Sequence, residues 1–189
     1  PTEALAAYGR AEAAGPGGSL TALGRARALF ALDRAGEAIS ILEASIAGFP
    51  EPALMTVLGE IYEATGRSTE ANDLYARTAA LIERHGAAGE DNTLEAARFH
   101  ADHGDPNEAV RYARLAFEAR PTVFAADALA WSLTRAGRST EALAYLEQAD
   151  LLGTDAADLD VHAAAAYAAA GLTEPARASL TEAFQVTPY

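Results

Sequence analysis

The sequence predicts an all-α protein, a right-handed α-solenoid of stacked helix–turn–helix repeats. The first observation is an alanine that recurs at steps of 33 to 38 residues, at positions 4, 38, 71, 109, 142 and 176. The second is a turn residue five positions before each alanine from the second copy onward: Asp33, Gly66, Gly104, Gly137 and Gly171. The third is the hexapeptide GRSTEA, identical at 66–71 and 137–142. Small residues suit helix contacts and glycine suits turns, so each copy predicts one helix pair.

These copies divide one continuous solenoid, residues 1–189, into an unpaired helix and five helix pairs. The unpaired helix, 1–16, corresponds to the second helix of a pair whose first helix is missing, so we expect a fragment of a longer or processed chain. The five pairs are expected at 19–50, 52–85, 90–121, 123–154 and 157–188.

The first pair, 19–50, fits the pattern least well. Arg25 and Ala26 stand where leucine and glycine are expected, and a Leu23-Gly24 dipeptide occurs two residues early. The sequence therefore leaves the register of the first helix in this pair open.

The second pair, 52–85, is the clearest copy, and an insertion follows it. The step from its alanine to the next is 38 residues, and the four extra residues fall near 84–91. Because Gly86 and Gly89 are poor helix formers, we expect the helix to break there and a longer connection to follow.

The remaining pairs carry a clear helix start and one unusual residue. In the third pair, 90–121, Asp105 is expected to cap a helix that has Pro106 in its first turn. The fourth pair, 123–154, holds the only tryptophan, Trp131, and the fifth, 157–188, is rich in alanine.

The stretch 55–83 carries residues by which the chain resembles a known family. It holds Leu58-Gly59, Tyr62, Gly66, Ala71 and Tyr75. This pattern resembles that of tetratricopeptide-repeat (TPR) proteins. The segments 94–105 (LEAARFHADHGD) and 125–137 (AADALAWSLTRAG) further resemble poorly characterised bacterial TPR-containing proteins of high-GC, actinobacterial-like origin. The resemblance implies the solenoid fold and an interaction role, and it supplies no substrate.

Composition limits the partners and the chemistry. The formal net charge is −13, which disfavours nucleic acid and strongly acidic partners. The chain has no cysteine, so disulfides, thiolate zinc sites and cysteine nucleophiles are excluded. No apolar run is long enough to span a bilayer, so we expect no membrane insertion by this segment. The compartment stays open.

His100 and His103, with Asp102 between them, form the most metal-like cluster in the sequence. Residues three apart share a helix face, so two imidazoles could meet one ion. His100, however, stands at the position that Tyr62 holds in the clearest copy, which indicates packing between helices. We therefore expect no metal and no cofactor. The sequence has no nucleophile-elbow or phosphate-loop spacing, and we expect no enzyme activity.

In the TPR fold the first helix of each pair lines a concave groove, and this implied geometry gives the candidate binding residues. Trp131 is either a binding hot spot or a packing residue against the neighbouring repeat. Arg98 and Arg135 either bind a partner's carboxylate or form ion pairs with Asp102 and Asp127. The expected groove residues are Arg98, Phe124, Asp127, Trp131, Arg135, His162, Glu60 and Leu94.

The fold and this groove favour a non-enzymatic scaffold that binds a protein or peptide. The alternative is a sensory or regulatory domain of a larger bacterial protein that controls an attached effector or binds a small molecule. Apolar surface at the terminal repeats adds self-association as a further expectation about partners.

Overall fold

The computed structural model of the chain describes residues 1–15, 18–151, 154 and 156–186. Within these ranges the chain forms eleven helices and no strand, which confirms the all-α prediction. None of these helices is both long and apolar enough to cross a membrane. The expected ends of the unpaired helix at residue 16 and of the fifth pair at residue 188 lie outside the described residues. The helices form two compact units, Pro1–Gly89 and Glu90–Tyr189.

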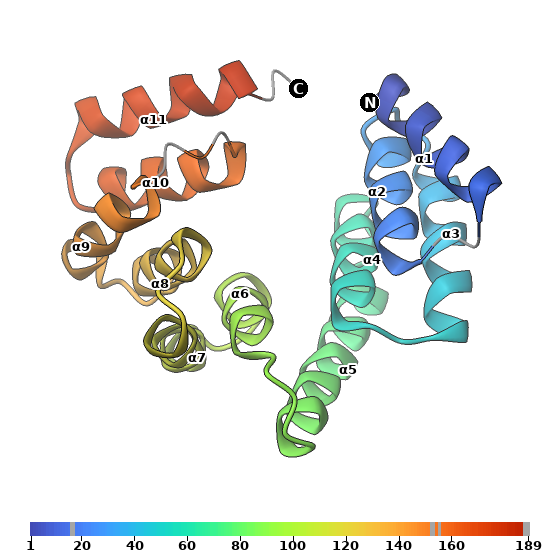
Figure 1. Ribbon diagram of the computed structural model, residues 1–189, viewed down its shortest axis with the longest axis horizontal. Helices are drawn as coiled ribbons and strands as arrows, with labels where there is room; N and C mark the ends of the chain where they lie inside the picture. The colour runs from blue at the N-terminus through green and yellow to red at the C-terminus, as the bar shows by residue number, and fades with distance from the viewer. Residues whose placement is uncertain (16–17, 152–153, 155, 187–189) are drawn as a thin grey trace. The chain divides into compact units, whose positions relative to one another are not determined.

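In the first unit each helix packs on the next one along the chain, and α2 also packs on α4 (Figure 1). Contact between alternate helices is typical of a stack of helix pairs, in which the first helices form one layer. The helices are α1 (Thr2–Ala14), α2 (Ser19–Phe30), α3 (Ala35–Gly48), α4 (Pro52–Ala64) and α5 (Ser68–Ala87).

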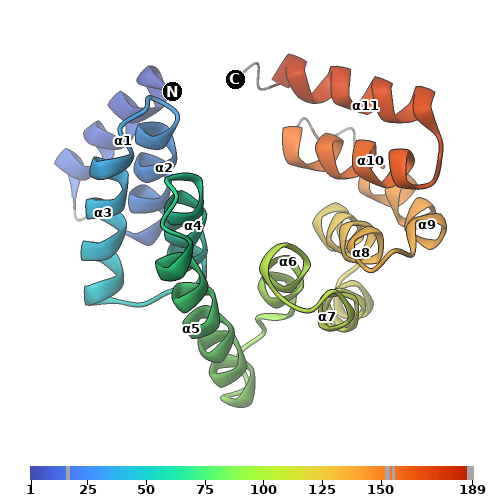
Figure 2. The same cartoon turned by 180° about the vertical axis from the view of Figure 1, so that it is seen from behind.

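The second unit repeats this arrangement over six helices (Figure 2). Successive helices pack on each other, and α8 also contacts both α6 and α10, so these three first helices lie in a row. The helices are α6 (Thr93–His103), α7 (Pro106–Ala119), α8 (Val123–Arg135), α9 (Ser139–Ala149), α10 (Ala157–Ala169) and α11 (Thr173–Val186).

Most of the recurring alanines are buried on the second helix of their pair. Ala38, Ala71, Ala109 and Ala142 are at most 1% exposed. A methyl side chain lets two helix backbones approach without leaving a void, which is why the position recurs. Ala4 differs, because it is exposed on α1, and α1 packs only on α2.

Four of the five predicted turns use a residue in the left-handed region. The φ angles are +57° at Asp33, +81° at Gly66, +74° at Gly137 and +79° at Gly171. Glycine reaches this region without the steric cost that a Cβ atom brings. Asp33 is the only non-glycine residue with positive φ in the described part of the chain, so it is the one turn that carries this cost.

Gly104 turns the chain differently, with a φ of −132°. The side chain of Asp105 accepts a hydrogen bond of 2.8 Å from the backbone N–H of Asn107, and Pro106 begins α7. The predicted cap is therefore confirmed. A side chain at Gly104 would meet His100, whose Nδ1 would lie 2.4 Å from the added Cβ atom. Glycine is needed here for close approach rather than for left-handed backbone.

The register of the first pair is settled by two small residues on α2. Ala26 is fully buried, so the register in which it faces the core holds. Gly24 lies instead against α1, where a Cβ atom would come within 2.1 Å of the Tyr8 ring. The early glycine in the sequence therefore serves the contact with the unpaired helix.

The insertion lengthens a helix before the helix breaks. Helix α5 runs through Gly86 to Ala87 over 20 residues, and Gly89 then turns the chain with a φ of +86°. The break therefore falls between the two glycines, as the sequence predicts, and the next helix begins only at Thr93. The boundary between the two units follows directly after Gly89.

An arginine–glutamate pair recurs at the start of three second helices. The pairs are Arg34–Glu37, Arg67–Glu70 and Arg138–Glu141, with N–O distances of 2.7, 3.0 and 2.5 Å. In the last pair Glu141 also meets Arg114 of α7. The hydrogen bond from Arg138 outweighs the opposing effect of burial and, with a further hydrogen bond from Arg114, holds the pKa of Glu141 below its usual value. Exposed pairs of this kind contribute little stability each.

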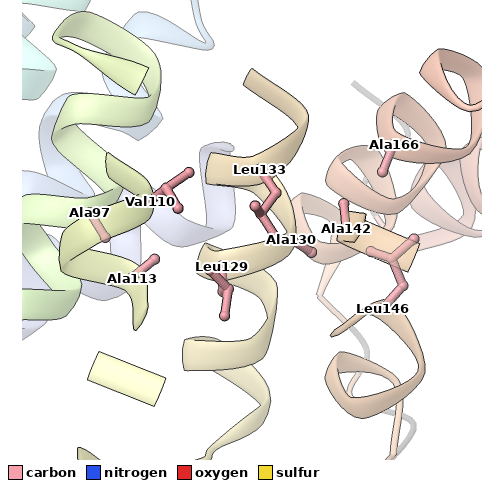
Figure 3. Packing of buried hydrophobic residues seen from close by; sticks show 9 residues of the cluster. All are labelled: Ala97, Val110, Ala113, Leu129, Ala130, Leu133, Ala142, Leu146 and Ala166. Atoms are coloured by element: carbon pink, nitrogen blue, oxygen red, sulfur yellow. The ribbon is translucent and has the colours of Figure 1, made fainter. Parts of the chain in front are cut away.

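Helix α8 is the centre of the core of the second unit (Figure 3). Figure 3 shows side chains of α6 and α7 on one side of α8 and side chains of α9 and α10 on the other. The labelled residues are Ala97, Val110 and Ala113, then Leu129, Ala130 and Leu133 of α8, then Ala142, Leu146 and Ala166. With α8 packed on both sides, its remaining face is held in a fixed position.

Candidate functional site

The remaining face of α8 carries a line of polar and aromatic residues. Asp127, Trp131 and Arg135 are spaced four residues apart, so they lie on one side of the helix, one turn above another. Because α8 lies between α6 and α10, residues of both neighbours reach this line. The resulting set is called the α8 cluster below, and its members are Asp102, Asp127, Trp131, Arg135 and His162.

The indole of Trp131 is held by both neighbouring helices. Its Nε1–H donates a hydrogen bond of 2.8 Å to Oδ1 of Asp102 on α6. Its ring stacks on the imidazole of His162 from α10, with 4.4 Å between ring centroids and 11° between ring planes. Trp131 is half-buried, so it packs between repeats while part of it stays accessible, and its role as a binding hot spot remains a prediction.

Asp127 is a carboxylate in the interior. Its side chain is 2% exposed, and its Oδ1 lies 2.9 Å from Nδ1 of His162, whose side chain is 20% exposed. Its other oxygen, Oδ2, is buried and has no hydrogen-bond partner among the described residues. A buried polar atom without a partner is rare in folded proteins and costly, so this oxygen calls for an explanation.

The two arginines expected near these acids bind elsewhere. Nε of Arg135 donates a hydrogen bond of 2.9 Å to the carbonyl oxygen of Ala101, and its guanidinium lies 5.4 Å from the centre of the Trp131 ring. Arg98 lies over the ring of Phe124, at 5.9 Å. Both distances are within the range of cation–π contacts. The acids have other partners, since Asp102 binds the indole and Asp127 binds His162.

The structure brings most of the expected groove residues together. Asp127, Trp131, Arg135 and His162 form one cluster, and Phe124 is 44% exposed near the start of α8. Leu94 is half-buried on α6. Glu60 is exposed on α4, which belongs to the first unit.

Asp102 joins the site from a first-helix position that the TPR resemblance places on the groove. The sequence held a signal for it, because Asp102 and Arg135 occupy the same position in consecutive repeats. A residue that stands at a groove position lies next to the first helix of the following repeat. That equivalence predicts a position on the shared face, although it does not say which side chain the residue will meet.

The three residues of the metal-like sequence cluster have separate partners. The His100 ring stacks on Tyr112 at 5.7 Å, and the His103 ring lies 6.0 Å from that of Phe99. Asp102 accepts its hydrogen bond from Trp131. Across the described ranges, no three histidine, aspartate or glutamate side chains gather as metal ligands would. The absence of a metal remains a prediction.

Comparison with known proteins shows the fold and leaves the family open. No family model matches the chain, and no curated protein matches it. Among solved structures, the chain is similar to a tetratricopeptide repeat protein from Parabacteroides merdae, with a TM-score of 0.62 and 18% identity over 98% of this chain and 72% of that one. It is also similar to TTC0263, a thermophilic TPR protein of Thermus thermophilus, with a TM-score of 0.58 and 18% identity over 89% and 91%.

A third similar structure contains TPR-like repeats of a putative kinesin light chain from Podosopora anserina, with a TM-score of 0.52 and 20% identity over 88% of this chain and 93% of that one. Identities this low carry information about the fold alone. The chain is therefore an α-solenoid of the TPR type, as its sequence predicts.

Proposed function

We propose that this chain is a non-enzymatic scaffold that binds a protein or peptide along the first helices of its second unit. The observation that carries the proposal is the α8 cluster, where aromatic and charged side chains from three successive first helices converge. Stacked helical repeats create extended surfaces of this kind, and ligands that lie across several repeats contact several helices at once.

Apolar contact area beside the cluster supports the proposal. Phe124 on α8 and Val161 on α10 are 44% and 46% exposed, and Leu94 on α6 is half-buried. Tryptophan, tyrosine and arginine are enriched among the residues that dominate binding energy. Arg98, which lies over the Phe124 ring, adds an arginine outside the cluster itself.

The net charge of the chain indicates which class of partner is favoured. With a net charge of −13, the chain repels nucleic acid and strongly acidic proteins at long range, so a neutral or basic peptide is favoured. We propose that the binding surface of the second unit consists of Arg98, Phe124, Asp127, Trp131, Arg135, His162 and Leu94. Glu60 lies in the first unit and stays a separate prediction.

A sensory or regulatory domain is the second candidate. The observation that favours it is the stack of Trp131 on His162 beside a buried carboxylate, because small-molecule sites combine aromatic walls with few polar groups. A small molecule would contact these three residues alone and would leave Phe124 unaffected. A peptide spans both, so substitution at Phe124 separates the two candidates.

The test is a screen of a random peptide display library against the wild type, Phe124→Ala and Leu115→Ala. Leu115 on α7 is a matched control, because it is apolar and 44% exposed, as Phe124 is. We expect the selected peptides to bind Phe124→Ala about tenfold more weakly, the loss of one central contact. Equal binding to all three proteins would contradict the proposal, as would an equal loss in both variants.

A further inference from the structure

Asp127 and Trp131 together form a site that a residue of the same chain occupies. The two residues lie one turn apart on α8, so the carboxylate and the indole face the same neighbour. His162 from α10 binds both, with its ring stacked on Trp131 and its Nδ1 at Oδ1 of Asp127. A planar group that stacks on an indole while binding a carboxylate is therefore already part of the structure.

His162 satisfies only half of this site. A carboxylate has two oxygens and accepts two parallel hydrogen bonds from a planar donor. The imidazole has one nitrogen directed at Asp127, and Oδ2 of that carboxylate remains buried with no partner among the described residues. The group that would fit better is planar, cationic and able to donate two parallel N–H bonds, which describes a guanidinium.

We infer that the Asp127–Trp131 pair binds an arginine side chain of the partner, whose guanidinium takes the place of His162. The inference rests on the proposed function and names the residue type that the peptide presents. The guanidinium stacks on Trp131 and donates one hydrogen bond to each oxygen of Asp127. The guanidinium replaces both contacts that His162 loses, the stack on Trp131 and the hydrogen bond to Oδ1 of Asp127. It also provides a hydrogen-bond donor for Oδ2.

The surroundings of the site favour a cation. The cluster holds two carboxylates, Asp102 and Asp127, against the single guanidinium of Arg135, and that guanidinium is held by the Ala101 carbonyl. The hydrogen bond to Asp102 fixes the orientation of the indole, so its ring stays in place when His162 leaves. His162 is the residue that can be displaced, because its side chain is 20% exposed and that of Asp127 only 2%.

The experiment uses three blocked peptides, Gly-Ser-Gly-X-Gly-Ser-Gly, in which X is arginine, lysine or citrulline. Lysine has the charge without the planar donor, and citrulline has the planar shape without the charge. Trp131 is the only tryptophan, so its fluorescence reports binding at the site itself. We expect arginine to bind about tenfold more tightly than either alternative, the value of one charge-assisted bidentate contact. Equal affinity of the arginine and lysine peptides would overturn the inference.

Two variants and one control test the carboxylate and the residue that the guanidinium replaces. Asp127→Asn should remove the preference for arginine, whereas Glu118→Gln, which removes an exposed carboxylate from α7, should retain it. His162→Ala should strengthen arginine binding several-fold, because it removes the competing occupant. Weaker binding by His162→Ala would show that the imidazole is a contact rather than a competitor and would overturn the inference. If circular dichroism shows Asp127→Asn to be unfolded, the three peptides on the wild type decide alone.

The outcome separates this inference from the proposed function. Library peptides that depend on Phe124 but show no preference for arginine refute the arginine site and leave the scaffold standing. If no library peptide binds and the arginine peptide leaves the fluorescence of Trp131 unchanged, both fail together. An unchanged preference for arginine in Asp127→Asn means that the carboxylate of Asp127 does not recognise the guanidinium, and the inference fails.

Discussion

The ring of Tyr75 on α5 lies so close to Gly59 on α4 that a Cβ atom on the glycine would come within 2.4 Å of Cε1 of the tyrosine. Tyr75 is buried, and its hydroxyl donates a hydrogen bond of 3.2 Å to Glu63. The ring is thus held from both ends, because it packs on α4 at its edge and is bonded to α4 at its tip.

Gly59→Ala should therefore destabilise the protein although alanine is the better helix former. We expect a loss of about 1–3 kcal/mol in the free energy of unfolding, because the added methyl overpacks the contact with Tyr75. The matched control is Gly9→Ala in α1, where nothing lies within 4 Å of the added atom and a gain of about 0.5–1 kcal/mol is expected. Urea unfolding of both variants measures the difference, and a stabilised Gly59→Ala would contradict the prediction.

Enlarging the recurring alanines should reveal the contact between paired helices. Ala71→Leu and Ala142→Leu add three carbon atoms where the alanines are buried, so each should cost about 1–3 kcal/mol. Ala80→Leu on the exposed side of α5 should change stability little. Denaturant unfolding that shows no loss at Ala71 and Ala142 relative to Ala80 would mean that the packing assigned to these alanines is wrong.

Acid should remove a stabilising contribution of Glu141. Its pKa is lowered in the folded protein, chiefly by the hydrogen bonds from Arg138, so the unfolded state takes up the proton first as the pH falls. The contribution is present above the unfolded pKa, about 4.3, and is lost as the pH falls through the lower folded value. Glu141→Gln lacks this contribution at every pH.

The measurement for Glu141 is the denaturant midpoint of wild type and Glu141→Gln, at neutral pH and in acid. We expect the two proteins to differ at neutral pH and to converge in acid. Glu118→Gln, which removes one exposed carboxylate from α7, controls for the change in net charge. A difference between wild type and Glu141→Gln that grows in acid would reverse the predicted sign.

Zinc and nickel should leave the melting temperature unchanged. His100 is engaged with Tyr112, His103 with Phe99, and Asp102 with Trp131, so a metal ion would have to disrupt three contacts to collect its ligands. Thermal melts with and without each metal test this, because an ion that binds only the folded state raises the melting temperature. A saturable increase that His100→Ala abolishes would show that a site exists.

The fold was predictable because its determinants are local and recur. Buried alanines such as Ala38 and left-handed glycines such as Gly137 follow from the close contact and the turn that each repeat needs. The last residue of α5 was not predictable, because one glycine costs a helix only about 1 kcal/mol and the helix continues one residue past Gly86. The division into an unpaired helix and five pairs, the right-handed twist and the bacterial origin remain predictions.

Only the helix face that carries the site was predictable from the sequence. Repeat positions place Trp131, Asp127 and His162 along the first helices, which is why they were expected together. The contacts among these residues depend on side-chain rotamers and on the offset between α8 and α10. A repeat pattern predicts neither of these. The pairing of His162 with Asp127 and that of Asp102 with Trp131 therefore appear only in the structure.

The hydrogen bond and the stack at Trp131 also bear on how the second unit comes apart. In a stack of repeats, end repeats usually fray before the middle melts, because each repeat is stabilised only by its neighbours. Asp102, Trp131 and His162 join three consecutive repeats through one indole, so opening either neighbour loosens the hold on the same side chain. The second unit is therefore expected to unfold with higher cooperativity than its separate interfaces would give, and Trp131 is the residue whose loss would let its repeats melt one by one.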